Sequence, residues 1–155
     1  MPLVRIALHR RPGDFARRVG ECVHAAMIDI LHIPEGDRFQ VITQHGHGDI
    51  VYDPAFLGID RSDGIVIIQI TLAAGRDRTV KSALYARIAG RLSSELGVRR
   101  EDVFINLLEV PPENFSFGNG EAQFADRLPP HLRSSDASRS SPPAAPTATS
   151  TVADV

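Results

Sequence analysis

An internal repeat constrains the fold of this chain more than any other feature. When the sequence is laid on itself with a shift of 65 residues, positions of the same character coincide. The matched pairs are Val19 and Leu84, Val23 and Ile88, Met27 and Leu92, Leu31 and Leu96, Ile33 and Val98, Asp37 and Asp102, Phe39 and Phe104, and Ile42 and Leu107. A repeat of this length holds a strand, a helix and a second strand, so the sequence predicts two βαβ units in one domain.

Hydrophobic periodicity assigns helices and strands to each unit. Apolar residues recur at helical spacing over residues 15–31 and again from 76 to 96, where Pro34 and Gly97 mark the helix ends. Strands are predicted at residues 2–9, about 38–45, 49–52, 64–73 and 103–110. The expected fold class is therefore α/β (α+β), with two helices on one face of a four-stranded core sheet.

The second face of this sheet is too apolar to be left in water. Along residues 65–72 the even-numbered positions make one apolar face, while Ile65 and Ile67 place apolar side chains on the other. The strand at 103–110 is likewise apolar on both faces. Two helices cover only one face, so we expect the other to be buried against further copies of the chain.

Composition excludes several classes of protein. The formal net charge of −2 gives no basic field for nucleic acid. No apolar run reaches the roughly 18 residues of a membrane span, and no signal-peptide pattern is present. Cys22 is the only cysteine and lies on the apolar stripe of the first helix, so we expect neither a disulfide nor a Cys-rich zinc site. We expect a cytoplasmic protein without a cofactor and without a nucleic-acid or membrane partner.

Residues 127–155 differ from the rest of the chain. Pro, Ser, Ala and Thr dominate this segment, which has almost nothing apolar to bury. Such a composition cannot offset the entropy lost on ordering. The sequence therefore predicts a domain over residues 1–126 and a disordered tail over 127–155.

Pro2 is the first candidate for chemistry. Met1 precedes a small residue, so we expect its removal and an N-terminal Pro2. The proline ring fixes φ, and the apolar strand that follows would anchor the secondary amine to a sheet. A free α-amine titrates at about 7.7–8.0, which suits a general base or acid near pH 7.

Six short motifs follow one another along the chain. They are Pro2-Leu3, Pro34-x-x-Asp37-Arg38-Phe39-Gln40, Gln44-His45, Leu57-Gly58-x-x-Arg61-Ser62, Gly75-Arg76 with Lys81 and Tyr85, and Ser116-Phe117-Gly118-Asn119-Gly120. With the duplicated βαβ unit, they resemble the tautomerase superfamily, and within it the malonate semialdehyde decarboxylase-like branch, over residues 2–126. The resemblance implies a homotrimer with the N-terminal proline at the floor of an active-site pocket.

The resemblance also implies roles for charged residues. It gives Asp37 the task of positioning or polarising water or substrate, although its repeat partner Asp102 favours a structural role. Arg76, near a helix start, is expected to hold a substrate carboxylate and to lower the pKa of the Pro2 amine. The branch uses two arginines one residue apart, and here an alanine falls at the first place. Arg76 and Arg78 have the right spacing but are displaced toward the helix, so a substrate role for Arg78 stays open.

Aromatic residues near the end of the domain complete the expected pocket. Phe115 falls where the branch often has a tryptophan, so an aromatic wall is kept but an N–H donor is lost. Phe117, in the motif that follows, is expected to bind substrate beside it.

One histidine pattern suggests a metal site, but weakly. His45, His47 and Asp49 alternate as ligands on one face of a strand would. Gly46 and Gly48 instead favour a turn, so no metal is expected and His45 is assigned to the substrate pocket or to structure.

The sequence leaves three functions open. The first is keto–enol tautomerisation of a 2-oxo acid by Pro2. The alternative is decarboxylation of a 3-oxo acid, or hydration of an unsaturated acid, with help from Asp37. The third is a non-catalytic trimer that binds a partner. The missing arginine weakens decarboxylation more than tautomerisation, because enolisation needs only a base and one anchor.

Overall fold

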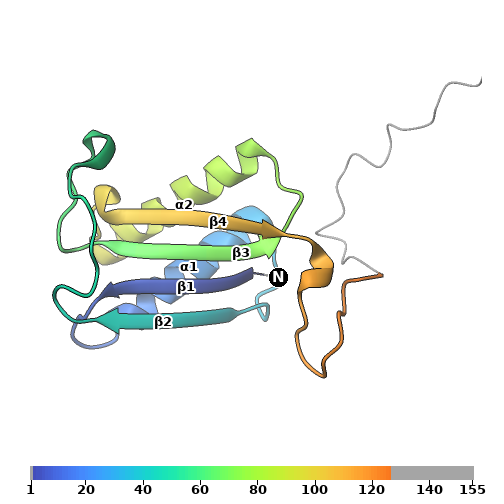
Figure 1. Ribbon diagram of the computed structural model, residues 1–155. Helices are drawn as coiled ribbons and strands as arrows, with labels where there is room; N and C mark the ends of the chain where they lie inside the picture. Colours follow the sequence, from blue (N-terminus) through green and yellow to red (C-terminus); the bar gives the residue numbers. More distant parts are fainter. Residues whose placement is uncertain (1, 127–155) are drawn as a thin grey trace, which may run out of the picture.

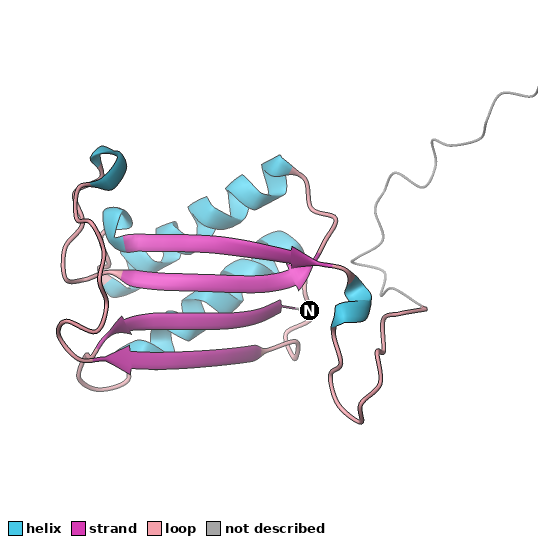
Figure 2. Cartoon of the chain, in the orientation of Figure 1, coloured by secondary structure: helices cyan, strands magenta, loops and turns pink. Residues whose placement is uncertain are grey.

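The protein, seen in a computed structural model that describes residues 2–126, is a sheet with two helices (Figure 1). Its elements in chain order are β1 (Pro2–His9), α1 (Phe15–Leu31), β2 (Phe39–His45), β3 (Val66–Ala73), α2 (Arg78–Leu96) and β4 (Val103–Val110). Figure 2 shows both helices on the same side of the sheet. The predicted fold class, two βαβ units with two helices on one face of a four-stranded sheet, is confirmed.

The order of the strands follows from the repeat. Each unit forms a parallel pair, β1 with β2 and β3 with β4, and the sheet order is β2-β1-β3-β4. The two central strands, β1 and β3, are antiparallel, with Pro2 opposite Leu72. The two units therefore run in opposite directions, and their first strands begin at opposite ends of the sheet (Figure 1).

The core lies between the sheet and the helices. Each central strand turns alternate apolar side chains toward α1 and α2, as a period of two requires. The largest fully buried side chains are Val4, Ile6, Leu8, Val19, Val23, Met27, Ile68, Ile70, Leu72, Leu84, Ile88 and Leu92. Burial of one such side chain contributes about 1.5–3 kcal/mol, so this layer supplies most of the driving force for folding.

Local signals set the bounds of α2. The Asp77 side chain accepts a hydrogen bond from the Val80 backbone N–H at 2.8 Å, which satisfies one of the free donors of the first turn. At the other end Gly97 adopts a φ of 67°, a conformation that glycine takes without strain. The predicted stop at Gly97 is confirmed.

The opposite face of the sheet is apolar and open in the single chain. Phe39 and Phe104 are 47% and 49% exposed there, and Val41 and Leu108 are exposed as well. Ile67 is half-buried on the same face. The predicted apolar second face is confirmed, while its burial in an oligomer stays a prediction.

One expected strand is not formed, and one expectation concerns residues outside the described part of the chain. Residues 49–52 form no strand, because the Asp49 side chain accepts a hydrogen bond from the Gly46 backbone at 2.7 Å and closes a turn. The expected disordered tail, 127–155, lies outside the described residues. Within the described part of the chain, neither helix is long and apolar enough to cross a membrane.

Candidate active site

A small cavity lies where β1 begins. Pro2 is buried as the first residue of that strand. The cavity has a volume of about 170 Å³ and is lined by Pro2, Leu3, Phe39, Phe115, Ser116 and Phe117. Apolar walls disfavour the charged form of an amine, so this environment lowers the pKa of any amine at its floor.

Phe117 is the centre of the aromatic wall. Its ring stacks on that of Phe115 at 5.4 Å between centroids, with 9° between the planes. It also contacts the rings of Phe39 at 6.2 Å and Phe124 at 5.1 Å. The predicted residues Phe115 and Phe117 therefore line the cavity with Pro2. The structure adds Phe39, which belonged to a recognised motif without an assigned role and which pairs with Leu3.

Gln123 fixes the loop that carries this wall. Its side-chain oxygen accepts a hydrogen bond from the Phe117 backbone N–H at 2.9 Å, and its amide nitrogen donates to the Gly118 carbonyl at 2.9 Å. The loop turns sharply at Asn119, where φ is 58°. No pattern in the sequence identified Gln123, because its role depends on how residues 111–126 return toward the sheet.

Arg76 lies on the loop after β3, at the end of the sheet where Pro2 begins β1. Leu72, two residues before the loop, pairs with Pro2, and Ala73 follows it. The Arg76 guanidinium donates a hydrogen bond to the Ala73 carbonyl. Burial lowers the pKa of Arg76, and the charge of Glu109 opposes this shift. The guanidinium stays protonated, so it supplies a half-buried cation at this end.

Glu109 on β4 braces this loop. Its carboxylate accepts hydrogen bonds from the backbone N–H groups of Gly75 and Arg76 and pairs with Lys81 Nζ at 2.5 Å. Burial by itself raises the pKa of Glu109, but the hydrogen bond and charge of Lys81 and the two backbone donors lower it overall. Lys81 belonged to a recognised motif, whereas its partner Glu109 was missed.

Asp37 lies at the same end of the sheet. It is 6% exposed, and its backbone N–H donates to the Pro34 carbonyl at 2.9 Å. It precedes Phe39 by two residues, and Phe39 pairs with Leu3, so the parallel register sets Asp37 beside the start of β1. One end of the sheet thus carries Pro2, Asp37, Arg76 and the phenylalanine wall.

Two predicted site residues lie apart from this group within one chain. Arg78 is exposed as the first residue of α2 and, like Arg76 and Asp37, does not line the Pro2 cavity itself. His45 pairs with His9 at the far end of β1, about 23 Å from Pro2 at the rise of a strand. His45 lines a separate cavity on the open face of the sheet. Its substrate role stays a prediction that needs a second subunit to bring it near Pro2.

The histidine pattern that suggested a metal forms a turn. His47 Nε2 lies 3.7 Å from Asp63 Oδ2, and its ring centroid is 5.6 Å from that of His9. Asp49 is bonded to the Gly46 backbone instead. Among residues 2–126, no three His, Cys, Asp or Glu side chains are placed to hold a metal ion.

The chain is a small duplicated α/β protein: its two βαβ units meet at the antiparallel strands β1 and β3, and β1 begins with a buried proline. The chain belongs to a family described as tautomerase enzyme, whose family model matches residues 37–118. It is 42% identical over 127 residues to the probable tautomerase YusQ of Bacillus subtilis (strain 168), covering 81% of this chain and 100% of that protein. The probable tautomerase YrdN of the same organism is 29% identical, with 80% and 96% covered.

Solved structures place the chain near one branch of the superfamily. FG41 malonate semialdehyde decarboxylase inhibited by 3-bromopropiolate matches with 40% identity and a TM-score of 0.74, over 79% of this chain and 93% of that one. Another malonate semialdehyde decarboxylase, described with decarboxylase and hydratase activities, matches with 29% identity, a TM-score of 0.73 and coverage of 79% and 95%. The resemblance inferred from the motifs is therefore confirmed.

Proposed function

We propose that this protein is an enzyme in which Pro2, made N-terminal by removal of Met1, moves a proton between carbon and oxygen of a 2-oxo acid. The observation that carries the proposal is that Pro2 is buried and lines an apolar cavity, at the end of the sheet that also holds Arg76. Membership of the tautomerase family supports the same chemistry.

The protonation state of Pro2 decides whether it can act as a base. Two features lower the pKa of its amine: the phenylalanine wall excludes water, and the Arg76 cation repels a second positive charge. Both shifts leave more of the amine neutral at pH 7, with a lone pair available. A general base with a pKa near the working pH is also the most effective one.

The proton then follows a simple path. Arg76 binds the substrate carboxylate with two N–H groups, while the C3 carbon faces the amine. Pro2 takes a proton from C3, the electron pair of that bond forms the C2–C3 double bond, and the carbonyl oxygen takes a proton from the Pro2 ammonium. The enol leaves and Pro2 is neutral again. Asp37 positions the substrate or a water molecule beside the amine.

Decarboxylation of a 3-oxo acid, or hydration of an unsaturated acid, is the second candidate. The likeness to malonate semialdehyde decarboxylase favours it, as does the buried Asp37. The first arginine of the expected pair is missing, since Ala73 and Ala74 stand there and Arg78 is exposed on α2. A single anchor suffices for enolisation, so tautomerisation is preferred.

We also propose that the active form is a homotrimer. The open face of the sheet carries half-exposed apolar side chains, including Phe104, that a partner would cover. A fused 4-OT described as a symmetric trimer has the same fold, with 20% identity and a TM-score of 0.65. If the protein converts no acid, the trimer would instead be a non-catalytic binding protein.

A product assay separates these functions. Protein confirmed by mass to lack Met1 is incubated in D₂O with a 2-oxo acid and, separately, with a 3-oxo acid. We expect exchange of C3 hydrogens in the 2-oxo acid without release of carbon dioxide. Carbon dioxide from the 3-oxo acid as the faster reaction would favour the decarboxylase. No conversion of either would favour the binding protein.

A further inference from the structure

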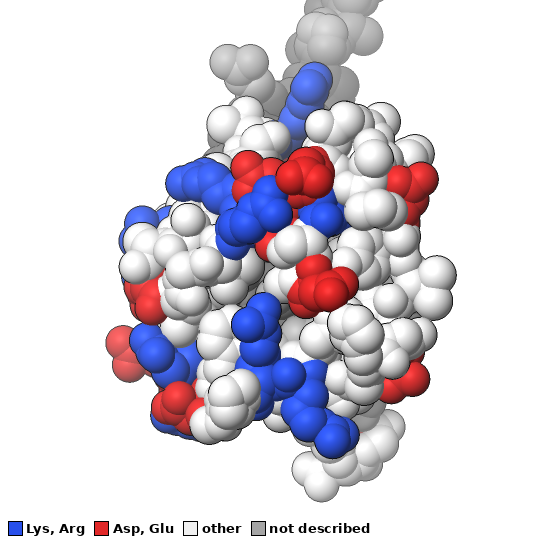
Figure 3. All heavy atoms as spheres, turned by 90° about the vertical axis from the view of Figure 1, so that its left-hand side faces the viewer, with Lys and Arg blue, Asp and Glu red and all other residues white. Residues whose placement is uncertain are grey.

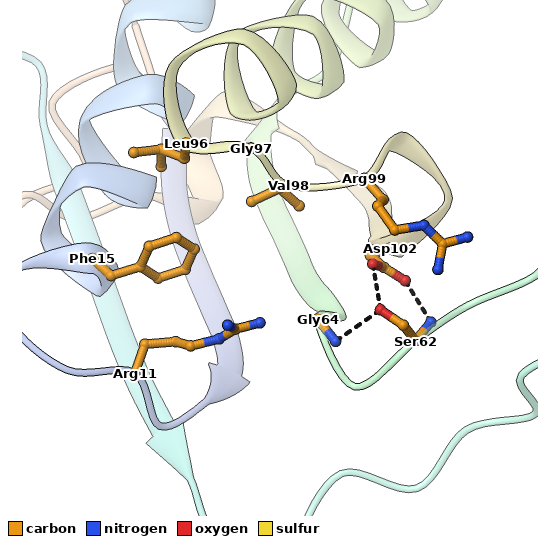
Figure 4. A pocket seen from close by; sticks show the side chains of 9 residues that line it. All are labelled: Arg11, Phe15, Ser62, Gly64, Leu96, Gly97, Val98, Arg99 and Asp102. Atoms are coloured by element: carbon orange, nitrogen blue, oxygen red, sulfur yellow. Dashed lines mark hydrogen bonds between the residues drawn. The ribbon is translucent and has the colours of Figure 1, made fainter.

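A second cavity, lined in part by charged and polar groups, lies at the opposite end of the sheet from Pro2. It has a volume of about 200 Å³, and its lining includes Arg11, Phe15, Ser62, Gly64 and Asp102. Figure 4 shows that these residues come from the turn after β1, the first turn of α1, the segment before β3 and the turn just before β4. None of them belongs to the site proposed for catalysis.

Asp102 forms the acidic side of this cavity. It is 2% exposed, and its carboxylate accepts hydrogen bonds from the Ser62 backbone N–H at 2.6 Å and from Ser62 Oγ at 2.7 Å (Figure 4). The Gly64 N–H donates to Ser62 Oγ at 3.1 Å, so the serine hydroxyl hydrogen is directed at Asp102. The carboxylate is thereby held in one orientation with lone pairs left for another donor.

Gly64 keeps the space in front of Asp102 open. A Cβ atom at this position would lie 3.0 Å from Asp102 Oδ2, 3.2 Å from Ser62 Oγ and 3.5 Å from Arg11 Nη2. An acceptor and a guanidinium donor therefore face the same small volume, which any side chain at this position would fill.

Arg11 supplies the basic side. Its guanidinium carbon lies 5.5 Å from the centroid of the Phe15 ring, a cation–π contact that orients the group. Its backbone N–H bonds to Gln44 Oε1 at 3.1 Å. Within residues 2–126 the guanidinium itself makes no hydrogen bond or ion pair, whereas Arg99 at the rim already donates to the Asp60 carbonyl at 2.9 Å. The donors of Arg11 are available to a ligand.

The internal repeat relates this cavity to the one at Pro2. A shift of 65 residues carries Arg11 onto Arg76 and Asp37 onto Asp102. The antiparallel pairing of β1 with β3 sets the two groups at opposite ends of the sheet. In the second unit the chain runs on through Gly64 to Val66, so the cavity has a cation and a carboxylate but a backbone amide in place of a terminal amine.

We propose that this cavity is a second ligand site, which binds a small hydroxy carboxylate without converting it. Arg11 binds the ligand carboxylate through two N–H groups, and Asp102 Oδ2 accepts a hydrogen bond from the ligand hydroxyl. A plain carboxylate of the same size gives Asp102 no donor and is disfavoured. The end of the molecule that carries the cavity mixes basic and acidic side chains (Figure 3), so selection comes from the cavity itself and not from a broad charged field.

The test is a titration of the ¹⁵N-labelled full-length protein with lactate, followed by NMR. We expect saturable shifts of the Ser62 and Gly64 amide signals, and weaker binding of propionate, which lacks the hydroxyl. Arg11→Gln should weaken lactate binding at these signals by at least about tenfold, since it removes a charged hydrogen-bond donor pair. Arg10→Gln, at the exposed neighbouring residue, is the control for loss of one positive charge and should leave binding unchanged.

Arg76→Gln separates this site from the one proposed for catalysis. It should leave the shifts of Ser62 and Gly64 intact, even if turnover is lost or was never present. The proposal is overturned if lactate produces no saturable shifts at these amides, if Arg11→Gln and Arg10→Gln bind it equally, or if propionate binds as tightly as lactate.

Discussion

The two βαβ units share one topology but differ where their first strands begin. In the second unit, a segment of chain leads into β3, and its Ser62 donates hydrogen bonds to the Asp102 carboxylate from its backbone N–H and its hydroxyl. In the first unit, β1 opens with Pro2 itself, and Asp37 takes the place of Asp102. The same carboxylate position therefore serves structure in one unit and adjoins a candidate amine in the other.

The helices of the two units also differ, in how many of their residues are buried. Nine residues of α1 are buried, among them Cys22 and Met27, whereas only Leu84, Ile88 and Leu92 of α2 are. Asp29 of α1 joins the helices by ion pairs with Arg87 at 2.6 Å and Arg91 at 3.1 Å. Duplication has preserved the arrangement of the elements while each unit acquired its own burial pattern.

The largest effect is expected when the Pro2 amine is changed. Pro2→Ala should keep the fold, because a residue at the end of a strand contributes little packing, but lower kcat by about 10²–10⁴-fold, the usual contribution of general base catalysis. Steady-state kinetics with a 2-oxo acid measures this. Val66→Ala, at the first position of β3, is the matched change in the second unit and should spare kcat once loss of stability is allowed for. Equal loss in both variants would contradict the comparison.

A smaller effect is expected at the two related arginines. Arg76→Gln should lower kcat/KM by about 10–100-fold, mostly through KM, because the carboxylate is bound in the ground and transition states alike. Arg11→Gln, its counterpart in the second unit, should leave kcat/KM within about twofold. Activity lost in Arg11→Gln but kept in Arg76→Gln would mean that the units have been assigned the wrong way round.

The paired aspartates should separate stability from activity. Asp102→Ala leaves both Ser62 donors without their acceptor and should lower the free energy of unfolding by about 1–3 kcal/mol. Asp37→Asn should instead lower turnover with a smaller change in stability. Chemical denaturation and kinetics on both variants give the comparison, and a purely structural result at both positions would remove Asp37 from the mechanism.

The weakest effect concerns the loop that carries Arg76. The pKa of Glu109 is lowered in the folded protein, so the bracing by its ionised form is complete above the ordinary value of 4.5 and is lost as pH falls through the lowered pKa. Lys81→Met removes a main cause of that lowering and should move the loss to higher pH. We expect KM in the variant to rise a few-fold at about pH 5 and to match the wild type at pH 7, as measured by kinetics across this range. An unchanged KM at every pH would show that Glu109 does not hold the loop.

Most of the fold was accessible from sequence because its signals are local. Helical spacing, the proline and glycine stops and the 65-residue repeat were enough to predict both helices and four strands. The predicted strand around Val51 was wrong, because the Asp49 side chain closes a turn there despite the strand propensity of the segment. Strand propensity is a weak guide when a side chain can cap the backbone locally.

The site was predicted less completely, for a physical reason. Pro2, Arg76, Phe115 and Phe117 belonged to recognisable motifs or lay beside them. Glu109 instead acts by bonding the backbone far along the chain, at Gly75 and Arg76, and Gln123 by bonding the Phe117 and Gly118 backbone within its own loop. Their contacts depend on where loops return to the sheet, which no periodicity encodes. His45 was placed by motif alone, and the parallel register sets it at the far end of β1.

The proposed catalysis requires that Pro2 carry a free amine whose pKa is lowered by its surroundings. Protein labelled with ¹³C and ¹⁵N in proline, and confirmed by mass to lack Met1, is titrated while the Pro2 ring signals are followed by NMR. We expect one ionisation below the ordinary range of about 7.7–8.0, and the same ionisation in the pH profile of kcat/KM. A pKa at or above that range, or full activity in protein that retains Met1, would contradict it.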